Sequence, residues 1–181
     1  MNIRALLLLF FVIVFVSACG PRPLHPGFDK FITDHPTEFS KVDQKAGYSI
    51  DEQSMKMEYV FRSMTAGGGL VMPGLMLKDY LDTSGPAAFK EMSEDPGKSA
   101  PLHLSFHINS FKFEGFQTHL DLHVTAERNG KQVLDKDYQA QGQKQGGKMF
   151  WGGAWAQRHA VHSSTQSSLN TIFNELLTDL K

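Results

Sequence analysis

The sequence predicts an α+β domain of two layers, in which an antiparallel sheet packs on a long C-terminal helix. Two patterns carry this prediction. Apolar and polar side chains alternate from Leu102 to Gln141, as on the two faces of a half-buried sheet. Apolar residues then recur with helical period from Leu169 to Leu180. The expected sheet is a three-stranded meander together with an N-terminal strand, and one such domain accounts for residues 28–181.

The first 18 residues have the pattern of a secretory signal peptide. A basic start containing Arg4 precedes an unbroken apolar run from Ala5 to Val16. As a helix, this run would be roughly 18 Å long, well short of the ~30 Å hydrocarbon core of a bilayer. A signal peptide over residues 1–18 therefore explains the run better than a membrane span.

Cys19 is the only cysteine in the chain, and the small residues Ser17 and Ala18 precede it. This Val-Ser-Ala-Cys segment resembles the lipobox of Gram-negative bacterial lipoproteins. The resemblance implies that Cys19 becomes the acylated first residue of the mature protein, and Gly20 in place of Asp implies the outer membrane. The alternative is a plain secretory signal followed by a free thiol, which would lack a partner in an oxidising compartment.

Residues 19–27 are predicted to be the lipidated cysteine and a proline-rich tether. Three prolines in this segment fix φ and remove backbone donors, which disfavours a helix or a central strand. The domain that follows has almost balanced charge, because the chain holds 18 basic and 19 acidic residues. No run of basic residues suggests nucleic acid or an anionic lipid surface as a partner. No second long apolar stretch exists, so the mature domain is expected to be water-soluble.

The first part of the domain is weakly patterned until residue 55. Residues 28–50 show no clear period, although four apolar side chains are expected to dock onto the domain: Phe28, Phe31, Ile32 and Phe39. Alternation from Met55 to Met64 predicts the N-terminal strand, which a run of three glycines at 67–69 ends. Two short helices are expected next, at Leu75–Leu81 and at Ala87–Met92.

The first turn of the meander is predicted from the need to keep apolar faces aligned. A three-residue loop, Glu114–Phe116, sets Phe106 opposite Val124. It also sets Ile108 opposite Leu122. A two-residue loop would place His107 opposite Leu122, which burial of one face forbids.

The second turn and the last helix complete the layers. Arg128–Gly130 is expected to form a turn that pairs Val124 with Leu134 and Leu120 with Tyr138. The helical stripe that should cover the apolar face comprises Leu169, Ile172, Phe173, Leu176, Leu177 and Leu180. A serine at 163, 164 or 167 is the expected cap of this helix.

Two candidate sites follow from the residue types. The predicted register places His107 across from His123, with Asn109 opposite Asp121. The imidazoles of His107 and His123 and the carboxylate of Asp121 form a ligand set for zinc or copper, while the ordinary alternative is a solvated polar face.

The second candidate is a glycine-rich segment at residues 142–156, which carries Phe150, Trp151 and Trp155. Tryptophan is enriched at binding hot spots, so these three residues are the predicted partner contact. The alternative is that the tryptophans fold back and cap one end of the sheet.

No catalytic template appears in the sequence. There is no G-x-S-x-G elbow, and acylation would consume the only thiol. The leading hypothesis is therefore a non-catalytic binding or assembly subunit of an envelope complex, anchored in the outer membrane and facing the periplasm, without a cofactor. Its expected partners are the membrane, through the lipid anchor, and an envelope protein. Two alternatives stay open: an accessory lipoprotein of lipid or lipopolysaccharide transport, and a periplasmic metal-binding lipoprotein.

Overall fold

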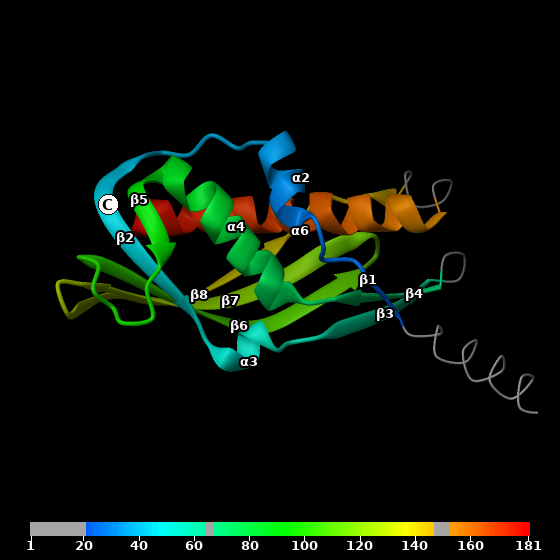
Figure 1. Cartoon of the computed structure of the whole chain (residues 1–181), viewed down its shortest axis with the longest axis horizontal. Coiled ribbons are helices and arrows are strands. Elements are labelled where there is room, and N and C mark those ends of the chain that lie inside the picture. The colour runs from blue at the N-terminus through cyan, green and yellow to red at the C-terminus, as the bar shows by residue number, and fades with distance from the viewer. Residues whose placement is uncertain (1–20, 64–66, 147–152) are drawn as a thin grey trace, which may run out of the picture.

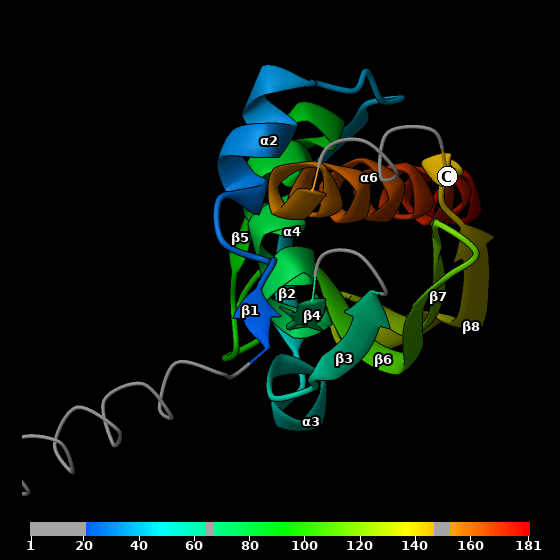
Figure 2. The same ribbon diagram turned by 90° about the vertical axis from the view of Figure 1, so that its right-hand side faces the viewer.

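The computed structural model describes residues 21–63, 67–146 and 153–181 (Figure 1). The elements in chain order are β1 (Arg22–Pro23), α2 (Phe28–Asp34), β2 (Val42–Ile50), α3 (Glu52–Met55), β3 (Tyr59–Ser63), β4 (Gly67–Val71), α4 (Pro73–Ala88), β5 (Phe89–Glu94), β6 (Leu102–Glu114), β7 (Gln117–Arg128), β8 (Lys131–Gln141) and α6 (Gly153–Asp179). The α+β class is confirmed. Helices α2, α4 and α6 lie on one side of the large sheet (Figure 2).

The sheet arrangement corrects the prediction of a single antiparallel sheet. One sheet has five strands in the order β5-β2-β6-β7-β8, and β2 runs parallel to both of its neighbours. A second, three-stranded sheet has the order β1-β4-β3. The large sheet is therefore mixed, with an antiparallel meander on one side of β2 and a parallel strand on the other.

Strand β2 replaces the predicted N-terminal strand as the neighbour of the meander. It lies in the weakly patterned segment, and Ala46, Gly47 and Tyr48 are buried in succession. A strand buried on both faces shows no alternation of apolar and polar residues, so the sequence pattern does not predict it. The alternating segment instead divides between α3, which Asp51 caps by accepting a hydrogen bond from Ser54 N–H, and β3 of the second sheet.

Helix α4 corrects the prediction of two short helices. A single helix runs through the Ser84-Gly85-Pro86 segment, and residues 89–94, expected to be partly helical, form β5. Its buried face continues through Tyr80, Leu81, Ser84 and Ala88. Tertiary packing along this face therefore overrides the local breaker signal.

The meander has the expected register at its first hairpin but a different turn. Phe106 pairs with Val124 and Ile108 with Leu122, as predicted. The turn, however, has only two residues, Gly115 and Phe116, both with positive φ. A β-bulge between Ile108 and Ser110 supplies the missing offset. The predicted alignment of the apolar faces is therefore confirmed, although a bulge rather than a longer loop produces it.

The second hairpin differs from the prediction by two residues. Asn129 and Gly130 form a two-residue turn with positive φ at both positions, again with a bulge near it. Leu134 therefore pairs with Ala126 instead of Val124, and Tyr138 pairs with Leu122 instead of Leu120. A shift of two residues leaves each side chain on its predicted face.

The C-terminal helix covers the apolar face of the sheet as predicted, but it begins earlier. All six residues of the predicted stripe are at most 4% exposed. Phe173 makes edge-on contacts with Tyr80 of α4 and Phe89 of β5. The expected serine cap is wrong, because α6 starts at Gly153 and Ser164 instead accepts a buried hydrogen bond from Thr118 N–H. Within the described ranges, no helix is both long and apolar enough to cross a bilayer.

The segment predicted to be a tether lies partly within the fold. Arg22 and Pro23 form β1, an edge strand that pairs in parallel with β4. Leu24 is fully buried, and its N–H donates to the carbonyl oxygen of Leu70 at 2.8 Å. The four apolar residues expected to dock do so, since Phe28 and Ile32 are buried and Phe31 and Phe39 pack partly buried against the core.

Candidate functional site

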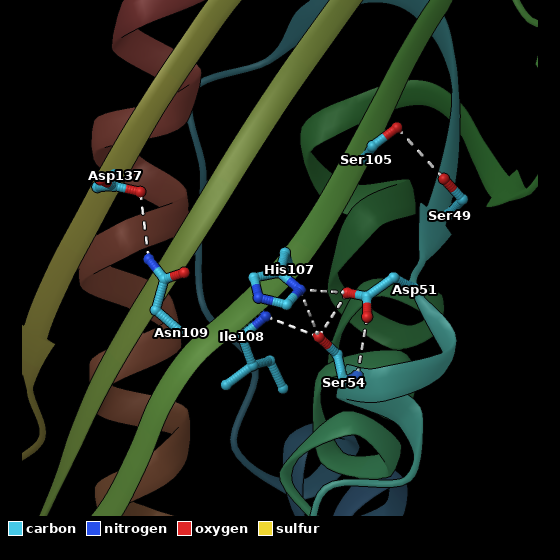
Figure 3. A network of polar contacts seen from close by, with 8 residues as sticks. All are labelled: Ser49, Asp51, Ser54, Ser105, His107, Ile108, Asn109 and Asp137. Atoms are coloured by element: carbon cyan, nitrogen blue, oxygen red, sulfur yellow. Dashed lines mark hydrogen bonds and ion pairs between the residues drawn. The ribbon is translucent and has the colours of Figure 1, made fainter.

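Polar side chains from the large sheet and from the start of α3 lie close together, among them His107 and the Asp51 carboxylate (Figure 3). His107 of β6 lies directly opposite His123 of β7, as predicted. Each ring pairs with a different carboxylate: His107 Nδ1 lies 2.9 Å from Asp51, and His123 Nδ1 lies 2.8 Å from Asp137. The two histidines are therefore neighbours in the sheet but contact separate carboxylates, and His123 Nε2 also lies 3.4 Å from Asp135.

The proposed metal ligands do not converge. Asn109 stands in the β-bulge, so Ser110 takes the position opposite Asp121. Asn109 Nδ2 nevertheless reaches the Asp121 carboxylate at 2.9 Å, and Gln139 donates to its other oxygen at 2.8 Å. Across the described residues, no group of three or more His, Cys, Asp or Glu side chains is arranged to hold a metal ion. The geometry thus does not support the metal hypothesis for His107, Asp121 and His123.

Ser54, His107 and Asp51 have the residue types of a hydrolytic triad, but a different order. In a triad the histidine stands between the serine and the carboxylate and contacts them through its two ring nitrogens. Here the Asp51 carboxylate stands between the others, accepting from Ser54 Oγ at 2.5 Å and from His107 Nδ1 at 2.9 Å. Ser54 is fully buried, and its Oγ accepts the N–H of Ile108 at 2.7 Å.

These hydrogen bonds hold α3 against β6. Burial alone would raise the pKa of Asp51, but hydrogen bonds from Ser54 and His107 outweigh it and lower that pKa below its ordinary value. The carboxylate therefore stays ionised as an acceptor for both partners. Its role in this arrangement is structural, because Ser54 Oγ is buried and already bonded to Asp51 and to the N–H of Ile108, while His107 Nδ1 lies farther from it, at 3.5 Å.

The predicted partner contact falls largely outside the described residues. Phe150 and Trp151 lie outside them, as does Cys19, and the side chain of Trp155 in α6 is not described either. What the structure does show is where the flanking elements lie. Strands β1, β3 and β4 and the start of α6 gather at one end of the molecule (Figures 1 and 2).

Sequence reasoning did not bring together a cluster of aromatic rings and histidines between α2 and α6. The ring of Phe31 on α2 contacts the rings of His159 and His162 on α6, with centroids 5.3 and 5.4 Å apart. His162 is 3% exposed, and its Nε2–H donates to the carbonyl oxygen of Leu24 at 2.7 Å. These residues are far apart in sequence, so only the helical spacing of His159 and His162 could have indicated their shared face.

The charges around His162 are mostly positive. Burial lowers the pKa of His162 to about 4, against the effect of its hydrogen bond to Leu24. The nearby groups Arg158, His159 and His25 lower this pKa further. His162 is thus a neutral ring that ties the N-terminal segment to α6.

Comparisons with known proteins show a shared fold and nothing finer. No protein-family model matches the sequence, and no curated protein matches it. The fold is similar to that of a crystal structure of a protein from the Gram-negative bacterium Xanthomonas campestris, described by the family model DUF330. That match has 11% identity and a TM-score of 0.50, and it covers 77% of this chain and 84% of the other. A second crystal structure, of an uncharacterised protein, matches with 13% identity, coverage of 77% and 94%, and a TM-score of 0.43.

Proposed function

We propose that this protein is a lipoprotein of the outer membrane, facing the periplasm, that serves as a non-catalytic binding or assembly subunit of an envelope complex. The observation that carries this proposal is the position of β1. Cys19 stands three residues before Arg22, the first residue of β1. At about 3.3–3.6 Å per residue, those three residues span at most about 11 Å. An acyl group on Cys19 would therefore hold the β1–β4 end of the domain close to the bilayer.

The attachment of this segment supports a fixed orientation. The backbone of Leu24 is bonded on both sides, since its N–H donates to Leu70 and its carbonyl accepts from His162. Its side chain is fully buried. The turn between β7 and β8, formed by Asn129 and Gly130, lies at the end of the molecule opposite β1 (Figure 1). The anchor would thus present that end and the polar sheet face to the periplasm, at a raised effective concentration for neighbouring envelope proteins.

The described polar clusters support binding rather than catalysis. Ser54, which has the neighbours of a nucleophile, is fully buried and donates to Asp51. The apolar face of the meander is covered by five side chains of α6 and by Leu180, which follows it, so carrying an acyl chain there would require α6 to move away. No separate observation favours the lipid-carrying alternative.

The test compares localisation and crosslinking in cells that express the full chain. We expect the wild-type protein in the outer-membrane fraction, crosslinked to a specific envelope protein. The Cys19→Ala protein should be absent from the outer-membrane fraction and should not form the crosslink. Trp151→Ala with Trp155→Ala should keep the fraction and lose the crosslink, whereas Val133→Ala, which removes an exposed apolar side chain at the far end, should keep both. A Cys19→Ala protein that stays in the outer membrane would refute the anchor, and unchanged crosslinks in the tryptophan variant would remove that loop from the interface.

A further inference from the structure

A cavity of about 420 Å³ lies between α2 and α6, beside the segment that leads towards Cys19. The backbone at residues 26–27 forms its rim. Six side chains from the two helices line it: Lys30, Phe31, Asp34, Arg158, His159 and His162. The sequence of neither helix alone predicts this cavity, because each helix contributes only part of its wall.

The cavity is rich in cationic groups with spare hydrogen-bonding capacity. Lys30 is exposed and forms no hydrogen bond or ion pair with any described residue. Arg158 is half-buried, and its one hydrogen bond to a described residue is a long one, from Nη2 to the carbonyl oxygen of Pro23 at 3.4 Å. Since a guanidinium carries five N–H donors, most of them remain open to a ligand. Asp34 is the only carboxylate of the lining.

The titration of His162 gives a second sign that this region is electropositive. Besides burial, three neighbouring basic groups, Arg158, His159 and His25, lower the pKa of His162. Burial and Arg158 lower the pKa of His25 as well. An anion beside these basic groups would be stabilised, and a guanidinium with a nearby ammonium suits a phosphate group in particular.

Part of the cavity wall is aromatic. Phe31 is only partly buried and packs at right angles to the ring of His159, with centroids 5.3 Å apart. It also stacks on His35 at 4.4 Å, which fixes the orientation of its ring. The cavity therefore combines donors for a phosphate with a rigid apolar surface for the carbon atoms that a phosphate ester carries.

We propose that this cavity binds a phosphate-bearing anion, and that the source of the phosphate is the headgroup of a phospholipid beside the anchor. The assignment of the source rests on the proposed function, because it requires this end of the domain to face the bilayer. Arg158 contacts Pro23, which lies four residues after Cys19, so the cavity would sit at headgroup level. Free phosphate is the other source with the same chemistry.

The test is a titration of the protein purified from membranes of cells expressing the full chain, held in neutral maltoside detergent. The probes are dihexanoyl phosphatidylglycerol and inorganic phosphate, and the readout is the NMR signals of the His159 and His162 rings. We expect both probes to shift these signals in a saturable way, with the lipid binding about tenfold more tightly because Phe31 contacts its carbon atoms.

Two double variants with the same change in net charge make the test specific. Lys30→Gln with Arg158→Gln should weaken binding of both probes at least about tenfold, since two charge-assisted contacts are lost. Lys41→Gln with Lys131→Gln, at exposed positions elsewhere, should bind like wild type. Lys30→Gln alone provides a test at an exposed position if the Arg158 variant fails to fold, and it should weaken binding several-fold.

The outcomes separate the two proposals. Ring signals that do not move at millimolar probe, or equal weakening in both double variants, would overturn the anion site. Inorganic phosphate binding as tightly as the lipid would overturn the phospholipid source. The mass of the N-terminal peptide from the same preparation reports acylation independently, so failure of the anchor is distinguishable from failure of the cavity.

Discussion

Helix α2 packs against both α6 and α4, and the groups that shift the pKa of a titratable residue differ between the two junctions, basic at the first and mainly acidic at the second. At the α6 junction, burial together with the basic groups Arg158, His159 and His25 lowers the pKa of His162 to about 4. At the α4 junction, burial together with the carboxylates of Asp29 and Asp82 raises the pKa of Asp79 to about 6.

The difference shows which form of its titratable group, His162 or Asp79, each junction stabilises. Both shifts favour the neutral form, downwards for an imidazole and upwards for a carboxyl group. The two junctions should therefore respond to pH in opposite directions, although the same short helix contributes to both. Three substitutions test this comparison, beginning with the core that supports both junctions.

The largest effect is expected at Phe173, which connects α6 to α4. Its ring contacts those of Tyr80, Phe89 and Phe39, and it is 2% exposed. Phe173→Ala should cost roughly 3–5 kcal/mol of unfolding free energy, because it leaves a cavity where the supports of both junctions meet. Urea denaturation of the variant and wild type measures this cost. A melting temperature within a few degrees of wild type would show that this core is wrongly assigned.

The second effect is the acid sensitivity of the α6 junction. The ordinary pKa of histidine is 6.5 and that of folded His162 is about 4, so the unfolded state binds more protons between these values. Stability therefore falls as pH falls through this window, by roughly 3 kcal/mol for the full difference.

Urea denaturation from pH 7 to pH 4 checks this prediction in wild type and His162→Gln. The variant should be less stable at pH 7, through loss of packing and of the bond to Leu24, but its stability should fall less steeply with acid. His35→Gln, at an exposed position, is the matched control and should keep the wild-type slope. Parallel pH profiles for wild type and His162→Gln would refute the role of His162.

The smallest effect has the opposite sign and belongs to the α4 junction. The folded pKa of Asp79 is about 6, above its ordinary 3.8, so the folded state binds more protons than the unfolded state in that window. Stability contributed by the protonated group is lost as pH rises. Asp79→Asn should therefore stabilise the protein above pH 6 by up to about 1 kcal/mol, a value reduced because the group is partly solvated.

The measurement for Asp79 is the urea midpoint at pH 4 and at pH 7.5. The gain from Asp79→Asn should appear only at the higher pH, while Asp34→Asn, at an exposed position on α2, should change neither midpoint appreciably. A gain at pH 4 that equals the gain at pH 7.5 would mean that the substitution acts through packing rather than through charge.

Burial on one face explains which parts of the fold could be predicted from the sequence. The meander alternates because only one face is buried, and this constraint placed Phe106 against Val124 even though the turn was shorter than expected. The bulge at Asn109 has no sequence signal, so the loop length was predicted wrongly. Strand β2 could not be found, because Tyr48 and its neighbours are buried on both faces and show no period.

The candidate sites show a similar division. The pairing of His107 with His123 followed from the register, but the carboxylate partner of His107 is Asp51, which follows β2 and lies outside the meander. The cavity at α2 and α6 could not be predicted at all, because Lys30 and Arg158 meet only after the fold forms. Neither stands in a run of basic residues, which is the pattern by which sequences usually reveal anion sites.

The proposed orientation of the domain depends most on the anchor at Cys19, and mass spectrometry of the N-terminal peptide from membrane-purified protein tests this anchor directly. We predict that the mature chain begins at Cys19 and carries a thioether-linked diacylglyceryl group. A peptide that retains residues before Cys19, or one with an unmodified thiol, would contradict the proposed orientation of the domain at the bilayer.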